Sequence, residues 1–375
     1  MNPTNIKNRL ERDLDNILAR TEPLWQELRG QRILITGATG FFGCWLLESF
    51  AWANRRLNLN ARAVAVSRHP ETLAQKALHL ASDPVIAQHA ADVCRNNFPQ
   101  GDFSHVIHAA TEASAALNRQ TPLAMFDTIM EGTRRALEFA AAKSARKFLF
   151  VSSGAVYGTQ PPQLTHVSES FNGAPDALDP ANAYAEGKRS AELLCALAAS
   201  SNLEVKIARC FAFVGPYMKL DAHFAIGNFI GDAMRGGPIL VKGDGSPFRS
   251  YLYASDLAVW LWTILFQGQS CRAYNVGSEE ALNIASLARE VAGALAPKLE
   301  VNISISSRST PGAPAHRYVP CTARARKELG LRAEVPLREA IRRTHAWYSE
   351  NTFSEQEISR AEVRAPEVSA RGTHA

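Results

Sequence analysis

Short apolar segments alternate with amphipathic segments along the first two thirds of the chain. The apolar segments RILITG, ARAVAVS, HVIHAA, KFLFVSS and EVKIARC have the length and β-branched content of strands, and a segment near IAQHAADV is predicted to form a strand at the sheet edge. The segments between them are predicted to be helices, including FFGCWLLESFAWAN, ETLAQKALHLA, PLAMFDTIMEGTRRALEFAAAK and YAEGKRSAELLCALAAS. Because strands that are apolar along their whole length are buried on both faces, the pattern predicts an α/β fold with a doubly wound parallel sheet.

The same pattern divides the chain into four parts. Residues 1–30 are predicted to form a helical extension before the first strand, because apolar residues recur there at helical spacing: Ile6, Leu10, Leu14, Ile17 and Leu18. Residues 31–212 form the predicted dinucleotide-binding Rossmann domain. Glycine and proline then become frequent, so we expect residues 213–348 to form a smaller mixed α/β substrate region, from which a segment near 273–277 returns to the sheet. The polar residues 349–375 are predicted to be a flexible tail.

Composition excludes several classes of protein. Of the 375 residues, 46% are hydrophobic and 21% charged, and the net charge of +5 comes from 41 basic and 36 acidic residues without a block of like charges that would bind nucleic acid. The six cysteines have neither metal-site spacing nor a histidine partner, so we expect reduced thiols, no metal and a reducing compartment. The N-terminus lacks the apolar core of a signal peptide, and no apolar stretch reaches the roughly 18 residues of a membrane span. We therefore expect a cytoplasmic protein that binds neither membranes nor nucleic acid.

The segment ITGATGFFG follows the first predicted strand and opens the first helix of the sheet. Gly37, Gly40 and Gly43 allow a tight turn and let the backbone approach a pyrophosphate. The helix start, with Phe41 and Phe42, adds unpaired N–H groups and the positive end of the helix dipole. In this setting the glycine pattern predicts a binding site for a dinucleotide.

The end of the second strand, AVSRHPE, bears on the choice between NAD and NADP. No acidic residue follows Val66 to accept a hydrogen bond from the ribose 2′-hydroxyl, whereas Ser67 and Arg68 suit a 2′-phosphate. We predict NAD or NADP as the cofactor, with NADP slightly favoured; an exposed Arg68 stacked on adenine is the alternative. Four further residues are predicted to contact the cofactor: Asp92, Val93, Ala109 and Ala110. For Asp92 the alternative is a simple turn residue.

Three polar residues at the carboxyl side of the sheet are the predicted catalytic residues. Ser153 ends the strand KFLFVSS, at the edge where this architecture binds ligands, and is predicted to touch the substrate. Tyr184 and Lys188 stand at i and i+4 of a predicted helix, so their side chains share one face. A phenol, with a pKa of about 10, is a weak base at neutral pH, but a neighbouring ammonium favours the phenolate, and Lys188 can also bond the nicotinamide ribose.

Together, the motifs TGATGFFG, HAAT, VSSGAVYG, YAEGK, GPY, GDG and YNVG resemble, in order from about Arg32 to Trp347, those of the extended short-chain dehydrogenase/reductases. More narrowly, they resemble the NAD-dependent epimerase/dehydratase family that acts on nucleotide sugars. The resemblance implies a catalytic set of Ser153, Tyr184 and Lys188, and a C-terminal region that holds a nucleotide sugar. It also implies a homodimer built on the helices that contain PLAMFDTIMEG and YAEGK.

The resemblance also assigns substrate-binding residues. Arg249 and Arg317 match arginines that bind the substrate diphosphate, for which a guanidinium is well suited; the alternative for each is a surface ion pair. Thr111 and Glu112, in the loop HAATEAS, are predicted to lie beside the substrate. Ala212 stands where many relatives have an asparagine near the substrate phosphate, so the donor nucleotide stays open.

The residues after Ser153 favour some reactions of this family over others. Its dehydratases follow the hydroxyl residue with an acid–base pair and its decarboxylases usually keep a glutamate there, whereas this chain has Gly154 and Ala155, which cannot move protons. An epimerase needs no such pair, so the leading prediction is a 4-epimerase that works through a transient 4-keto sugar. An NADPH-dependent 4-keto-sugar reductase is the close alternative, and a 4,6-dehydratase or decarboxylase, in which Glu112 supplies the missing group, is a more distant one. A non-catalytic dinucleotide-binding protein is an alternative from another class, and the intact catalytic set counts against it.

Overall fold

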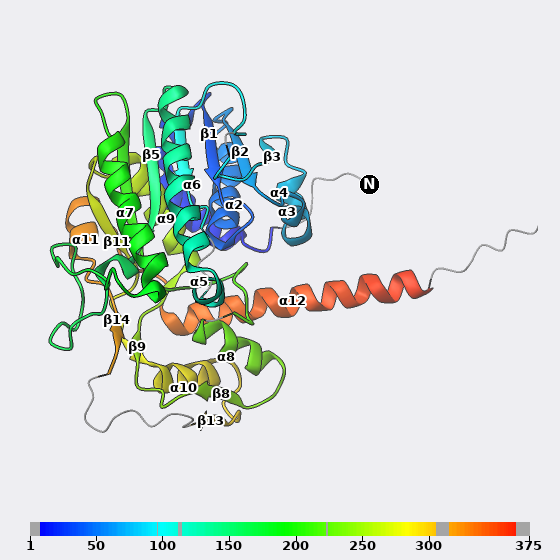
Figure 1. Cartoon of the computed structure of the whole chain (residues 1–375). Coiled ribbons are helices and arrows are strands. Elements are labelled where there is room, and N and C mark those ends of the chain that lie inside the picture. The colour runs from blue at the N-terminus through cyan, green and yellow to red at the C-terminus, as the bar shows by residue number, and fades with distance from the viewer. Residues whose placement is uncertain (1–7, 96, 112–114, 223, 305–314, 365–375) are drawn as a thin grey trace, which may run out of the picture.

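A seven-stranded parallel sheet forms the centre of the molecule (Figure 1). The computed structural model describes residues 8–95, 97–111, 115–222, 224–304 and 315–364. Across the sheet the order is β11-β6-β5-β4-β1-β2-β3, and each neighbouring pair is parallel. The strands are β1 (Arg32–Thr36), β2 (Arg62–Ser67), β3 (Ile86–Ala90), β4 (His105–His108), β5 (Lys147–Ser153), β6 (Glu204–Cys210) and β11 (Ala273–Val276). The predicted α/β fold class is confirmed, and β11 joins the sheet where the sequence predicted a returning segment.

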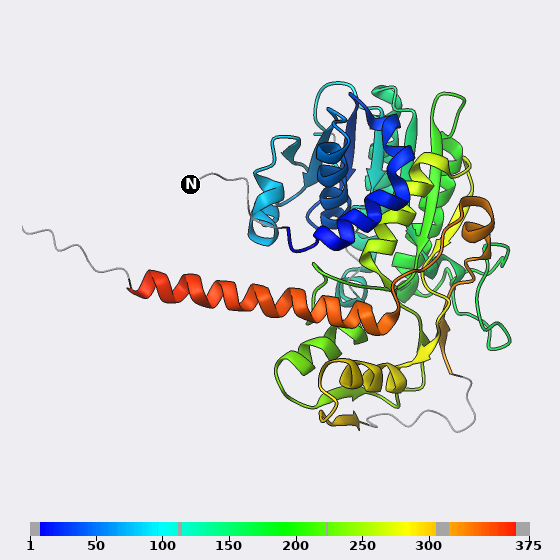
Figure 2. The ribbon, with the colours of Figure 1, turned by 180° about the vertical axis from the view of Figure 1, so that it is seen from behind.

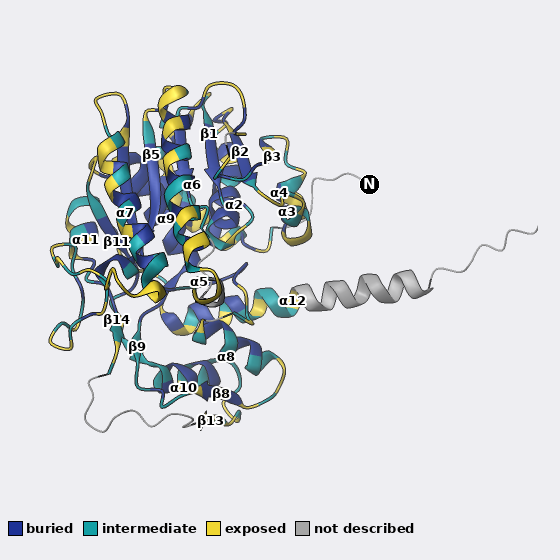
Figure 3. Ribbon diagram, in the orientation of Figure 1, coloured by how far each residue is buried: buried dark blue, intermediate teal, exposed yellow. Residues whose placement is uncertain are grey.

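The alternation of residues along each strand gives the sheet two buried faces (Figure 3). On β1, Ile33 and Ile35 belong to the core on one face, which α1 (Glu11–Thr21), α2 (Phe41–Arg56) and α9 (Ala254–Gln267) cover. Leu34 belongs to the core on the other face, which α6 (Pro122–Ala142) and α7 (Ala183–Ala198) cover. Figures 1 and 2 show these two helical layers from opposite sides. Because both faces are buried, only the carboxyl edge of the sheet is available for a ligand.

Shorter helices connect these main elements. The predicted helix ETLAQKALHLA is divided at Ala77, whose φ of −153° is not helical, into α3 (Glu71–Lys76) and α4 (Leu78–Ala81). The other short helices are α5 (Ala115–Gln120), α11 (Ala323–Leu329), and the 3-10 helices η2 (Gly154–Tyr157) and η3 (Pro180–Asn182).

The N-terminal extension packs on the α9 side of the sheet. The sequence predicted one helix there, whereas α1 is followed by a separate 3-10 helix, η1 (Glu22–Leu28), with proline in its first turn. A proline at the start of a helical segment lacks the N–H that would continue the preceding helix, which explains the break. Trp25 of η1 is buried, and its ring lies 4.6 Å from that of Trp262 in α9. The extension is therefore part of the core rather than an appended arm.

The substrate region lies beyond the carboxyl edge of the sheet (Figure 1). It has its own apolar core, to which α8 (Ala225–Met234), α10 (Ile284–Leu295) and the first turns of α12 (Leu337–Arg364) contribute. Its strands form three small sheets. In the first, β7 (Phe213–Val214) pairs with β10 (Leu252–Tyr253), and in the second, β8 (Ile239–Lys242) pairs with β13 (Val301–Ser304). In the third, β9 (Phe248–Arg249) lies between β12 (Leu282–Asn283) and β14 (Arg317–Tyr318). The domain boundaries proposed from the sequence stay a prediction.

Helix α12 differs from the tail that the sequence predicted over residues 349–375. Its backbone stays helical to Arg364, and the helix runs out beyond the body of the molecule (Figure 2). No glycine or proline interrupts residues 337–364, so nothing in the local sequence ends the helix earlier. Residues 365–375 lie outside the described part. No helix in the described part is both long and apolar enough to cross a membrane.

Candidate active site

The glycine turn between β1 and α2 has the geometry that close backbone contact requires. Gly37 has a φ of +68°, and a Cβ there would lie 2.6 Å from the carbonyl oxygen of Ala109. A Cβ on Gly43 would lie 2.4 Å from Ala38, so the start of α2 also packs against backbone. Gly40 is the N-cap of α2, and Phe41 and Phe42 begin the helix. The turn therefore presents the N-terminus of α2 at the carboxyl edge of the sheet, as the pattern predicted.

The end of β2 lies beside this turn. The hydroxyl of Ser67 is 3.1 Å from that of Thr39, within the glycine turn, and accepts a hydrogen bond from the His69 amide. Lys76 of α3 reaches the same turn and donates to the Thr39 carbonyl at 2.7 Å. Arg68 is exposed at this corner. The structure thus brings Ser67 and Arg68 close to the glycine turn and adds Lys76, which the sequence reasoning missed.

The remaining predicted cofactor contacts line the same edge of the sheet. Asp92 accepts a hydrogen bond from the Cys94 amide at 3.0 Å, which is the turn geometry that the sequence analysis gave as its alternative role. Val93 is buried against α6, within 2.8 Å of where a Cβ on Gly132 would lie. After β4, the Ala110 amide donates to the hydroxyl of Thr36 at 3.2 Å.

Ser153, Tyr184 and Lys188 meet at the carboxyl end of β5. The Ser153 hydroxyl lies close enough to the Tyr184 phenol to lower its pKa, and it accepts a hydrogen bond from the Ala155 amide at 3.1 Å. Lys188 lies one turn after Tyr184 on α7 and is buried, with its Nζ donating to the Val151 carbonyl at 2.7 Å. The three predicted catalytic residues are therefore neighbours in space.

Burial dominates the electrostatics of this cluster. It raises the pKa of Tyr184 to about 12, and the nearby Ser153 hydroxyl offsets this only in part. Burial also lowers the pKa of Lys188 to about 8. The sequence analysis expected the ammonium of Lys188 to make the phenol more acidic, and that expectation stays a prediction. In this structure Lys188 Nζ donates to two neighbouring oxygens, those of Val151 and Thr111.

The loop after β4 supplies one of those oxygens. Thr111, predicted to lie beside the substrate, accepts a hydrogen bond from Lys188 Nζ at 3.1 Å and donates to the Ala110 carbonyl. Its hydroxyl therefore positions the lysine. Glu112 lies outside the described residues, so the structure does not place it. Within the described residues, no cluster of histidine, cysteine and carboxylate side chains could hold a metal ion.

An aromatic wall occupies the place where an acid–base pair would stand. A Cβ on Gly154 would lie 2.7 Å from the ring of Phe211, so this position holds glycine because the ring fills the space. The ring of Phe211 lies 4.7 Å from that of Tyr318, whose hydroxyl is 3.4 Å from the Ser153 hydroxyl and 3.4 Å from the Cys210 carbonyl. The sequence reasoning missed Tyr318, since it lies far from Ser153 along the chain.

The two predicted diphosphate arginines do not point the same way. In the parallel pair of β9 and β14, Tyr318 is opposite Arg249 and Arg317 is opposite Phe248. Since successive side chains of a strand alternate between faces, Arg249 shares a face with Tyr318, while Arg317 lies on the other face over the Phe248 ring. The face of Tyr318 is the one that reaches Ser153, so only Arg249 is directed toward the catalytic cluster.

A family model agrees with this architecture. The model for the NAD dependent epimerase/dehydratase family matches residues 33–277, which is more than half of the chain. The chain belongs to the NAD dependent epimerase/dehydratase family. It is therefore an enzyme of a family that uses NAD to modify nucleotide sugars.

Individual members of the epimerase/dehydratase family differ in reaction. The chain is 28% identical over 337 residues to UDP-glucuronic acid decarboxylase 2 of Arabidopsis thaliana, which covers 89% of this chain and 72% of the relative. It is similar in fold to UDP-glucose 4-epimerase of Thermotoga maritima, solved with UDP-glucose, with a TM-score of 0.72, 19% identity and coverage of 86% of this chain and 99% of that one. It is also similar to dTDP-glucose 4,6-dehydratase of Bacillus anthracis, solved with NAD, with a TM-score of 0.70, 18% identity and coverage of 86% and 97%. At these identities the two structures show the fold alone.

The site of this family member fits a nicotinamide dinucleotide. Gly40 has only its own turn within 4 Å of where a Cβ would stand, which leaves the backbone at the start of α2 open to a pyrophosphate. Two of the three N–H donors of Lys188 have an acceptor among the described residues, Thr111 and Val151, so one remains for a ribose hydroxyl. The comparisons name NAD rather than NADP, so the slight preference for NADP gains no support from them.

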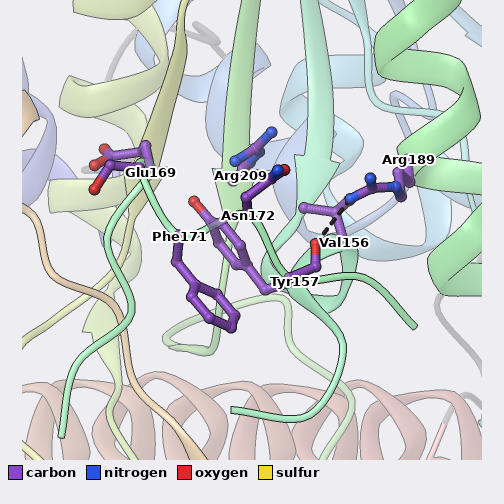
Figure 4. A pocket seen from close by; sticks show the side chains of 9 residues that line it. Val156, Tyr157, Glu169, Phe171, Asn172, Arg189 and Arg209 are labelled. Carbon is purple, nitrogen blue, oxygen red and sulfur yellow. Dashed lines mark hydrogen bonds between the residues drawn. The ribbon is translucent and has the colours of Figure 1, made fainter. Parts of the chain in front are cut away.

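A separate polar pocket of about 360 Å³ lies beside the turn that follows Ser153 (Figure 4). Tyr157, Arg189 and Arg209 line it together with residues 169–173. Arg209 is paired with Glu192, and Arg189 donates to the Gly173 carbonyl, so both guanidinium groups have acceptors within the protein. None of the predicted catalytic residues lines this pocket.

Proposed function

We propose that this enzyme is a nucleotide-sugar 4-epimerase that works through a transient 4-keto sugar. The observation that carries the proposal is the contrast between the assembled Ser153–Tyr184–Lys188 cluster and the Gly154–Phe211 packing beside it. The cluster of three residues provides for oxidation and reduction at one carbon. The packing of Phe211 against Gly154 leaves no acid or base at position 154 for the elimination of water.

Each residue of the cluster has a distinct part in this chemistry. A nicotinamide dinucleotide held by the glycine turn and Lys188 would supply the hydride acceptor and donor for this carbon. Tyr184 takes the proton of the substrate hydroxyl onto its phenol oxygen and gives it back in the return step. The hydroxyl of Ser153 holds the same substrate oxygen by a hydrogen bond, and Lys188, held by Thr111, keeps a positive charge beneath the site. Gly154 and Ala155 take no part in moving protons.

An NADPH-dependent 4-keto-sugar reductase is the second candidate, since it needs the same three residues. Arg68 and Lys76 beside Ser67 favour it, because two cations at the end of β2 suit a 2′-phosphate. UDP-glucuronic acid decarboxylation, the reaction of the Arabidopsis relative, is disfavoured by Ala155 in the position where decarboxylases of the family usually keep a glutamate.

A single product assay separates these reactions. Purified enzyme is incubated with UDP-glucose, UDP-galactose and UDP-glucuronic acid in turn, and the products are identified by NMR. Interconversion of the C4 epimers without net oxidation supports the proposal. Release of carbon dioxide from UDP-glucuronic acid would show a decarboxylase and overturn it. Steady oxidation of added NADPH with a 4-keto sugar, without epimerisation, would show a reductase.

We also propose that the enzyme is a homodimer joined through α6 and α7. These helices pack side by side and expose Leu123, Leu193 and Leu197, of which Leu197 is 74% exposed. Exposed leucines on neighbouring helices suit an apolar contact between two copies. Leu197→Glu is expected to produce monomers in light scattering after size exclusion, while Leu240→Glu, in the substrate region, should leave the dimer intact. A monomeric wild-type protein would refute this proposal.

A further inference from the structure

Arg249 carries a charge that no carboxylate balances in the part of the chain that the structure describes. Its Nη1 donates to the Phe248 carbonyl at 2.7 Å and lies 3.3 Å from Nδ1 of His316. Burial lowers the pKa of Arg249, and the other groups that act on that pKa are the phenols of Tyr251 and Tyr318. A partly buried cation without a carboxylate is costly to keep in the folded protein unless an anion joins it.

His316 completes a line of side chains that leads away from the catalytic cluster. The line begins at Ser153, continues through the Tyr318 hydroxyl at 3.4 Å and the Arg249 guanidinium 5.9 Å from the Tyr318 ring, and ends at His316. One tyrosine side chain thus separates the Ser153 hydroxyl, which is proposed to hold the reacting oxygen of the substrate, from the Arg249 cation. A hexose has similar length, so a sugar whose reacting carbon lies at Ser153 brings its phosphates to Arg249.

The strand register explains why the side chain of residue 316 lies beside Arg249. His316 precedes β14, and its carbonyl accepts a hydrogen bond from the Phe248 amide, which fixes the backbone of this residue against β9. Alternation then places the His316 side chain on the face of Tyr318 and Arg249. Arg317, on the opposite face, is directed away from them.

We propose that His316, rather than Arg317, is the partner of Arg249 in binding the diphosphate of the substrate, and that His316 does so in its protonated form. The inference rests on the proposed nucleotide-sugar chemistry. It makes substrate affinity depend on pH through a residue outside the catalytic cluster.

The direction of the pH effect follows from the neighbours of His316. Among the residues that the structure describes, the charged group that faces His316 is Arg249, with the phenols of Tyr251 and Tyr318 behind it. Burial and Arg249 together hold the pKa of His316 below its usual 6.5. Neutral Nδ1 can accept from Arg249, whereas a protonated ring has no lone pair to offer it. A diphosphate between the two cations raises the pKa of His316, so binding takes up a proton. Affinity therefore rises as pH falls through the bound-state pKa and levels off below the free-state pKa.

Titration calorimetry with UDP-glucose, UDP-galactose and dTDP-glucose tests the proposal, because their doubly esterified diphosphates do not themselves titrate in this range. For the wild type we expect the Kd to fall by about fivefold to tenfold between about pH 8 and about pH 5.5, with proton uptake seen as a dependence of the enthalpy on the buffer. His316→Gln should abolish both effects. His316→Arg should bind tightly at both pH values without taking up a proton, a rescue that a purely structural role of His316 does not predict.

Three further variants separate the explanations. His89→Gln, at a half-buried histidine on the edge strand β3, should behave as the wild type. Arg249→Gln should weaken binding at every pH. The inference is overturned if His316→Gln keeps the pH dependence, or if Arg317→Gln loses affinity while His316→Gln does not. A wild type that binds no sugar nucleotide would instead overturn the proposed function, and this inference with it. The melting temperature of each variant confirms that it is folded.

Discussion

The pKa of Tyr184 is set by a competition between burial and hydrogen bonding at one residue. Burial raises that pKa to about 12, since it disfavours the charged phenolate, and the Ser153 hydroxyl lowers it. A substrate hydroxyl that replaces Ser153 as partner has to lose its proton to this same oxygen. In the proposed mechanism the phenol acts in contact with the substrate, so its removal should affect turnover rather than binding.

Tyr184→Phe is expected to lower kcat by about a thousandfold or more, because it removes the proton acceptor while keeping the ring. Binding of NAD should change by less than about twofold, since the phenol oxygen contacts Ser153 rather than the glycine turn. Steady-state kinetics and fluorescence titration with NAD measure the two quantities. Phe139→Tyr, near the C-terminal end of α6 and packed against Phe98 and Phe103, serves as a control for altered ring chemistry. A Tyr184→Phe enzyme with wild-type kcat would exclude the mechanism.

Arg68→Ala tests cofactor choice. Arg68 is exposed and directly follows Ser67 at the end of β2, where a 2′-phosphate is proposed to lie. We expect the Kd for NADP to rise by about tenfold and the Kd for NAD by less than about twofold. Arg62→Ala, at the other end of the same strand, is the matched control. Equal losses for the two dinucleotides would show that Arg68 stacks on adenine instead.

At the scale of the element, local sequence patterns predicted most of the helices and strands of this protein. They did not predict which distant segments pair with one another. The strands of the sheet were predictable because each is a short apolar run between turns, and Tyr184 and Lys188 because helical spacing places them on one face. His316 and Tyr318 were not predictable. Their proximity to Arg249 depends on the pairing of β14 with β9, which joins residues 69 positions apart, and no repeat or spacing marks that register.

One carboxylate, in addition to the buried Trp25, links the 3-10 helix η1 to the sheet. Glu27 accepts from Lys147 Nζ at 2.8 Å and from His105 Nε2 at 3.0 Å. Burial lowers the pKa of His105, so the neutral ring donates through Nε2 while its Nδ1 faces the Ser104 hydroxyl. Burial works against the Glu27 carboxylate, but the bonds from His105 and Lys147 outweigh it and hold the pKa of Glu27 at about 2.

Glu27→Gln should destabilise the fold by about 1 kcal/mol at pH 7, a value reduced for the partial exposure of the side chain. The folded-state pKa lies below the ordinary 4.5, so the carboxylate contributes its full stability above pH 4.5 and loses it as the pH falls toward about 2. Urea midpoints measured from pH 7 downward should show the gap between wild type and variant closing in that interval. Glu22→Gln, exposed on the same helix, should show no gap. A gap that stays constant with pH would rule out the charge as its cause.

At the scale of the whole molecule, a buried charge joins the N-terminal helix to the substrate region. Asp13 of α1 accepts from the Tyr253 hydroxyl at 2.7 Å and from Arg343 of α12 at 2.5 Å. Tyr253 immediately precedes α9, so three segments that are distant in sequence meet at one carboxylate. Burial nevertheless raises the pKa of Asp13, which shows that the surrounding donors do not fully repay its removal from water.

Arg343→Met should therefore destabilise the protein by about 3 kcal/mol, because it leaves the buried Asp13 without its cation. Arg342→Ala, on the exposed side of α12, is the matched control and should change stability by less than about 0.5 kcal/mol. The triple variant Asp13→Leu/Tyr253→Phe/Arg343→Met removes the whole polar group, so no charge remains buried and stability should return to within about 1 kcal/mol of the wild type. Urea denaturation of all three variants measures these differences. The Arg343 guanidinium also lies 5.6 Å from the centre of the Tyr253 ring. A triple variant as unstable as Arg343→Met alone would mean that Arg343 stabilises the protein by packing against Tyr253 and not by neutralising Asp13.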